Sequence, residues 1–87
     1  MASLRSIQAV AKWGVDGQCH KAVEEFGELI TALMRFYNGR GTTHDVVTEI
    51  ADCYILLDQL SYMFGERDVR KEMIFKKSRL MEGLAND

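Results

Sequence analysis

The stretch KAVEEFGELITAL, from Lys21 to Leu33, decides the fold because it sets apolar residues at helical spacing beside three glutamates, Glu24, Glu25 and Glu28. Residues three apart on a helix are neighbours on one face, so Glu25 and Glu28 point the same way. On a helical wheel, five apolar residues fall within roughly 80° of Glu25. They are Ala22, Leu29, Ala32, Leu33 and Phe36. The stretch therefore predicts an amphipathic helix with an acidic pair on or beside its inward face.

A second stretch, from Glu49 to Leu60, repeats this combination with the pair Glu49 and Asp52. The apolar residues on the same face as Glu49 are Val46, Cys53, Leu56, Leu57 and Leu60. Isolated charge on an inward face is very costly, so four carboxylates around a common interior need a cation between them. The alternative is a solvated, glutamate-rich face. The matched placement of both pairs favours a metal site.

The chain predicts one all-α domain covering residues 1–87, a small helical bundle of three long helices and a short N-terminal one. It contains no proline, and its apolar residues recur at helical spacing. Ser3, Asp16 and Asp68 are the expected N-caps of the first, second and fourth helices. Thr42 and Asp45 have capping-box spacing at the start of the third. The expected helices are about 3–13, 16–37, 42–64 and 68–84.

The break Asn38-Gly39-Arg40-Gly41 is short, so the second and third helices are expected to return antiparallel as a hairpin. From the middle of that turn, one acidic pair lies about 13 residues back and the other about 10 residues forward. At 1.5 Å per residue the two pairs are offset by roughly 4–5 Å along the hairpin. The pairs can therefore face each other across one interhelical gap.

Composition limits the functional classes. Hydrophobic residues make up 47% of the 87, more than so short a chain buries easily, which favours a homodimer or homotetramer. The net charge of −2 and the scattered basic residues argue against nucleic-acid binding. Cys19 and Cys53 belong to no metal-ligand set and are interpreted as buried thiols. No membrane-spanning run or signal peptide is recognised, so a cytoplasmic protein is expected.

Oxygen ligands alone favour a hard cation, Mg²⁺ or Mn²⁺ in its place. A di-iron carboxylate site is the obvious competitor, but it needs Glu-x-x-His pairs. Glycines stand three residues before His20 and His44, so neither histidine supplies such a pair.

The acidic residues also follow a family pattern. Glu24-Glu25-Phe26-Gly27-Glu28, twenty residues, and then Glu49-Ile50-Ala51-Asp52 spell EExxE…ExxD. The pattern resembles the MazG-like, all-α nucleoside triphosphate pyrophosphohydrolases, over about residues 18–82. The resemblance implies Mg²⁺-dependent hydrolysis of a (d)NTP to the monophosphate and pyrophosphate by an oligomeric protein.

The resemblance also implies roles for individual residues. By motif position, Glu25, Glu28, Glu49 and Asp52 would be metal ligands, and Glu24 would support the site or position water. Either Glu24 or Glu28 could take the proton of the attacking water. The chain is shorter than larger relatives and lacks inserted helices for a base pocket, which suggests that a neighbouring subunit completes that pocket.

Four further residues are candidates for substrate binding. Lys76 falls on the apolar stripe of the last helix and Arg79 on its edge, where both would suit the β and γ phosphates; the alternative is that both extend to solvent. Lys21 and Gln18 lie on the same helix face as Glu25. Lys21 is a candidate counter-ion or phosphate contact, and Gln18 is a candidate nucleotide contact.

The sequence also allows two other functions. One is a non-catalytic helical interaction module that dimerises through its apolar excess, its acids being a relic or a structural cation site. The other is hydrolysis of a different pyrophosphate-containing metabolite, because a carboxylate site of this kind recognises metal and phosphates and not a base.

Overall fold

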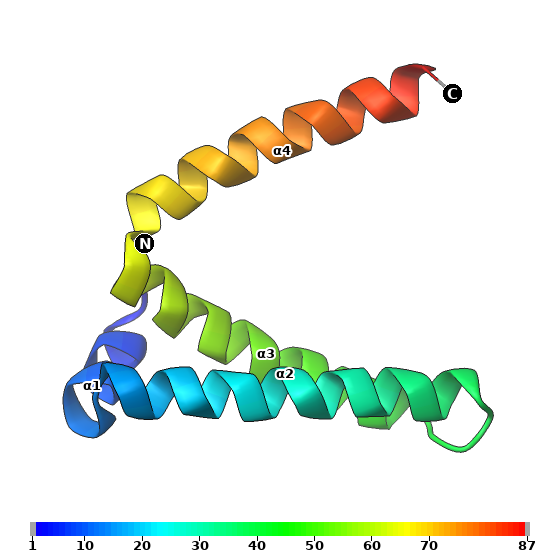
Figure 1. Cartoon of the computed structure of the whole chain (residues 1–87), viewed down its shortest axis with the longest axis horizontal. Coiled ribbons are helices and arrows are strands. Elements are labelled where there is room, and N and C mark those ends of the chain that lie inside the picture. Colours follow the sequence, from blue (N-terminus) through cyan, green and yellow to red (C-terminus); the bar gives the residue numbers. More distant parts are fainter. Residues whose placement is uncertain (1, 87) are drawn as a thin grey trace.

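The computed structural model describes residues 2–86, which form four α-helices and no strand (Figure 1). Their bounds are Leu4–Trp13 (α1), Val15–Tyr37 (α2), Thr43–Phe64 (α3) and Glu66–Asn86 (α4). The all-α prediction is confirmed. No helix among the described residues is long and apolar enough to cross a membrane.

The helices α2 and α3 form the expected antiparallel hairpin (Figure 1). Its turn ends on the predicted capping box: the Thr42 side chain accepts a hydrogen bond from the Asp45 backbone N–H, and the Asp45 carboxylate accepts one from the Thr42 N–H. The buried apolar residues of the hairpin, two of which are alanines of α2, are Ala22, Ala32, Cys53 and Leu56. Because alanine adds so little bulk, the two helix backbones can approach closely beside Glu25.

The first helix and the α3–α4 corner are tied together by a polar network. Ser3 caps α1 as predicted, accepting a hydrogen bond from the Ser6 N–H. The Asp58 carboxylate of α3 accepts hydrogen bonds from the Ser3 N–H (3.0 Å) and from the Ser6 hydroxyl (2.5 Å). The Ala2 N–H donates to the Glu66 carboxylate at the start of α4. This network fixes α1 across one end of the hairpin.

Two predicted N-caps were wrong. The second helix begins at Val15, directly after Gly14, and the fourth begins at Glu66, directly after Gly65. Both glycines have positive φ, 85° and 117°, so each turns the chain within a single residue and leaves no room for a longer link. Asp16 and Asp68 lie instead in the first turns of their helices. A negative charge there interacts favourably with the helix dipole.

The last helix does not close a bundle with the other three. None of its residues is buried, and among the helices it contacts only α3 (Figure 1). The expected apolar stripe of α4 is therefore exposed along most of its length. The described chain has the shape of an arm extending from a helical hairpin.

Candidate metal centre

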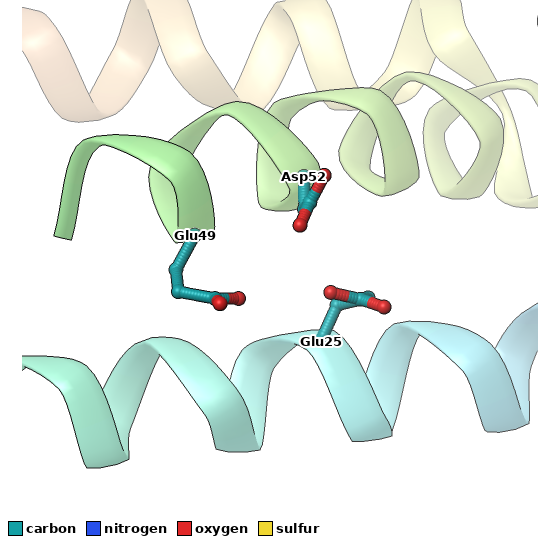
Figure 2. Close-up of side chains that lie close together, drawn as sticks. All are labelled: Glu25, Glu49 and Asp52. Atoms are coloured by element: carbon teal, nitrogen blue, oxygen red, sulfur yellow. The ribbon is translucent and has the colours of Figure 1, made fainter. Parts of the chain in front are cut away.

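Three of the four predicted metal ligands converge between α2 and α3. Glu25 of α2 and both Glu49 and Asp52 of α3 point toward one another (Figure 2). One carboxylate oxygen from each lies within 4.8 Å of the others. Oxygen atoms that coordinate one divalent ion must lie close together. The three side chains could therefore hold one ion with little movement.

Glu25 is the most unusual of the three because it is almost fully buried, with 7% of its surface exposed. Its Oε1 pairs with the Lys21 ammonium at 3.1 Å, one helical turn earlier. Its Oε2 is buried and has no hydrogen-bond partner. A buried, half-satisfied carboxylate is destabilising, and a cation beside Oε2 would remove that cost.

Glu49 is in a similar position on the opposite helix. Its Oε2 is also buried without a hydrogen-bond partner. Loss of hydration, followed by the negative charges of Glu28, Asp52 and Glu25, raises the pKa of the Glu49 carboxyl above its usual range. The electrostatic field between the helices therefore favours a positive charge there, whether a proton or a metal ion.

Cys53 adjoins the cluster without offering a ligand. Its thiol donates a hydrogen bond to the Glu25 carbonyl oxygen, with 3.5 Å between Sγ and O. Burial, and then the charge of Glu25, raises the pKa of the Cys53 thiol, so the sulfur stays protonated at neutral pH. Cys53 is buried as predicted, whereas Cys19 is only partly covered. The donor set remains oxygen only, which suits Mg²⁺ or Mn²⁺.

The fourth predicted ligand, Glu28, lies at the edge of the cluster. It is exposed and lines an open groove of about 730 Å³ together with Glu24, Thr31, Arg35, Thr48 and Glu49. Glu49 thus belongs to both the cluster and the groove. A molecule in this groove would lie directly beside the three converging carboxylates.

Arg35 is a groove residue that the sequence reasoning missed. It follows Glu28 by seven residues, which returns it to nearly the same angle on the helix. The sequence alone therefore indicates that Arg35 and Glu28 lie on the same face of the helix. Arg35 brings a permanent positive charge into an otherwise acidic groove, where it could contact a phosphate.

The four predicted substrate-binding residues lie in different surroundings. Lys21 pairs with Glu25, and Gln18 is buried, its Nε2 donating to the Gln59 Oε1 at 2.6 Å. Lys76 and Arg79 are exposed on α4 and do not line the groove, and the Arg79 guanidinium lies 5.9 Å from the centre of the Phe75 ring. The substrate-binding roles of all four stay predictions.

Compared with models of known families, with curated proteins and with solved structures, the chain shows no match.

Proposed function

We propose that the protein is a Mg²⁺-dependent nucleoside triphosphate pyrophosphohydrolase, acting as a homodimer or homotetramer. It would convert a (d)NTP and water to the monophosphate and pyrophosphate. The observation that carries the proposal is the buried Glu25 carboxylate. Its Oε2 lacks a hydrogen-bond partner, and one of its oxygens lies within 4.8 Å of carboxylate oxygens of Glu49 and Asp52. An acidic face serving only solubility would leave its carboxylates in water, where they cost little.

The proposed role of each acidic residue follows from how deeply it is buried. Glu25, Glu49 and Asp52 would hold the ion, which when bound neutralises phosphate charge and polarises a phosphoryl oxygen. Lys21, paired with Oε1, would hold the Glu25 carboxylate oriented toward the site. Glu28 and Glu24 both line the groove. Glu28 is the better candidate for the general base, because its charge acts on Glu49 and it therefore lies nearer the cluster. It would accept the proton of a water molecule attacking the α-phosphorus.

The groove supports a phosphate-containing substrate. Its Arg35 guanidinium and its Thr31 and Thr48 hydroxyls can donate hydrogen bonds to phosphate oxygens. These groups would orient the triphosphate along the hairpin with its α-phosphorus beside Glu28. None of them selects a base, so another pyrophosphate-containing metabolite fits the same chemistry.

The direct test is incubation with each common dNTP and with damaged nucleotides in the presence of Mg²⁺, measuring pyrophosphate and orthophosphate separately. We expect pyrophosphate and the monophosphate in equal amounts. Orthophosphate alone would show that a different phosphoanhydride bond is cleaved. A lack of turnover with every nucleotide tested would reject the activity.

A non-catalytic interaction module is the second candidate, favoured by the many exposed apolar side chains. Calorimetric titration separates the two functions. An enzyme should bind Mg²⁺ and a non-hydrolysable dNTP analogue with positive coupling, each tightening the other. A scaffold should bind no nucleotide analogue and show no coupling, whether or not its acids hold a structural cation.

A further inference from the structure

The proposed function leaves a second pocket, at the corner between α1 and α2, without a role. Its volume is about 440 Å³, within the roughly 300–1,000 Å³ of small-molecule sites. It lies at the end of the hairpin away from the turn (Figure 1). Its walls are formed by the last residue of α1 and by five residues of α2, and they are Trp13, Gly17, Gln18, His20, Lys21 and Glu24. We call it the corner pocket.

Trp13 is the unusual residue of the corner pocket, because 59% of this large apolar residue is exposed. It stands at the end of α1, where Gly14 with positive φ turns the chain into α2. The Lys12 ammonium lies over its ring, 5.2 Å from the ring centre. An exposed aromatic ring can stack on a nucleic-acid base, and a cation beside it attracts an anionic nucleotide. The corner pocket therefore suits a planar aromatic group that belongs to an anion.

Gln18 gives the corner pocket a fixed polar group. The residue is only 8% exposed, and its Nε2 donates a hydrogen bond of 2.6 Å to the Gln59 Oε1 of α3. This bond holds the amide between the two helices, while the residue still lines the pocket. Because the amide is already ordered, it loses little conformational freedom when it hydrogen-bonds the polar edge of a ligand.

Gly17 keeps the wall of the corner pocket open. A Cβ built at this position would meet nothing within 4 Å, so a side chain there would enter free space. A glycine within a helix is destabilising by roughly 0.5–1 kcal/mol relative to alanine. The pocket is thus kept open at some expense of helix stability, and its shape can be changed without disturbing the core.

The corner pocket adjoins the acidic groove, because Glu24 lines both. Along α2, Glu24 is four residues, or about 6 Å, from Glu28. The helix leads from the corner pocket past Glu24 to Glu28 and on to Arg35. A nucleoside triphosphate carries its base, sugar and phosphates in the same order. Its sugar would lie at Glu24, whose carboxylate can accept hydrogen bonds from sugar hydroxyls.

We propose that the corner pocket binds the base of the substrate, with the ring stacked on Trp13 and its polar edge at Gln18. The inference rests on the proposed function, because it places the phosphates in the groove. It narrows the substrate class to nucleotides, since a pyrophosphate-containing metabolite without an aromatic ring would leave the pocket empty. Stacking is available to every base, so the pocket separates nucleotides from other pyrophosphates more strongly than one base from another.

The first test uses the fluorescence of Trp13, which is the only tryptophan of the chain. The full chain is titrated in Mg²⁺ with a non-hydrolysable dNTP analogue and, separately, with inorganic triphosphate, and calorimetry measures the binding of both. We expect saturable quenching by the analogue and none by inorganic triphosphate. An analogue that binds without quenching, or equal quenching by both ligands, would overturn the proposal.

The second test changes the pocket in two opposite ways. Trp13→Ala removes the stacking surface and should weaken binding of the analogue about 10–100-fold. Gly17→Leu fills the pocket and should weaken it comparably. Neither change should alter the affinity for inorganic triphosphate. Gly83→Leu on α4 is the matched control, because a side chain there also enters free space, and this variant should bind both ligands like the unmodified chain.

The outcomes separate the corner pocket from the proposed function. Unchanged binding of the analogue in both variants, with pyrophosphate still released from dNTPs, would overturn the base site and leave the proposed function in place. An unmodified protein that binds neither ligand and releases no pyrophosphate would overturn both. If Trp13→Ala fails to fold, Gly17→Leu and its control decide the matter, because adding a side chain to a helical glycine removes no contact.

Discussion

At the scale of single residues, the balance between burial and charge at Glu49 is the most informative feature. A carboxyl whose pKa is raised by folding destabilises the folded state as the pH rises above its unfolded value, near 4.3. At neutral pH that cost is present unless a cation offsets it. The acidic cluster should therefore stabilise the protein only when it is loaded with metal.

Glu49→Gln should therefore raise the melting temperature measured in EDTA, because it removes one of several like charges. The same change should abolish the further rise that Mg²⁺ gives to the unmodified protein. Thermal melts of both proteins with EDTA and with Mg²⁺ provide the four values needed. An equal Mg²⁺-induced rise in the variant would remove Glu49 from the ligand set.

Glu28 and Glu24 differ in their expected effects although both line the groove. Glu28→Gln should lower kcat by about 10²–10⁴-fold, the usual contribution of a general base. It should leave Mg²⁺-dependent thermal stabilisation largely intact, because the three converging ligands remain. Glu24→Gln is the matched control and should lower kcat much less. The reverse order of effects would assign the base to Glu24.

Asp58 has a structural role that the sequence did not reveal. Hydrogen bonds from the Ser6 hydroxyl and the Ser3 N–H lower the pKa of the Asp58 carboxyl. Its contribution to stability is therefore present above the unfolded pKa and is lost as the pH falls through the lower folded value. The partner serines lie more than fifty residues earlier, so no local pattern indicated the contact.

Replacing Asp58 by Asn should lower the free energy of unfolding at pH 7 by about 1.5 kcal/mol, the scale of a hydrogen bond to a charged group. The deficit should shrink as the pH is lowered below about 4, the usual pKa of an aspartate in an unfolded chain, because the unfolded protein then binds a proton that the folded carboxyl resists. Urea unfolding from pH 7 to pH 3 measures the deficit at pH 7 and its change with pH. Glu72→Gln on α4 is the control. A deficit unchanged by pH would assign the loss to packing.

At the scale of helices, local signals decided where most elements begin and end. The Ser3 cap, the Thr42–Asp45 capping box and the ends at Tyr37 and Phe64 all agree with the sequence. The errors at Asp16 and Asp68 share one cause. A single glycine with positive φ can separate two helices, and a sequence pattern does not distinguish that link from a longer loop ending on an aspartate.

The capping box gives a test at this scale. Thr42→Ala should lower the free energy of unfolding by about 1 kcal/mol, because it leaves a helix-start N–H without its acceptor. Thr43→Ala is the matched control, since the neighbouring side chain makes neither capping bond. Chemical unfolding of both variants gives the comparison, and equal losses would contradict the role of the cap.

At the scale of the whole molecule, the sequence predicted the hairpin and the facing acids but not the position of α4. Helical periodicity and a short turn are enough to place Glu25 opposite Glu49 and Asp52, because both act within adjacent elements. The apolar stripe of α4 indicates a buried face without saying which surface covers it. The extended arm leaves Lys76 and Arg79 outside the groove of their own chain.

In the proposed function, Glu25, Glu49 and Asp52 hold one divalent ion between α2 and α3. Calorimetric titration of the nucleotide-free protein with Mg²⁺ tests it most directly, comparing the unmodified chain with Glu25→Gln and with the exposed control Glu82→Gln. We expect one site per chain in the unmodified protein and in Glu82→Gln, and no measurable binding in Glu25→Gln. Equal Mg²⁺ binding by all three proteins, or no binding by the unmodified chain, would contradict the claim.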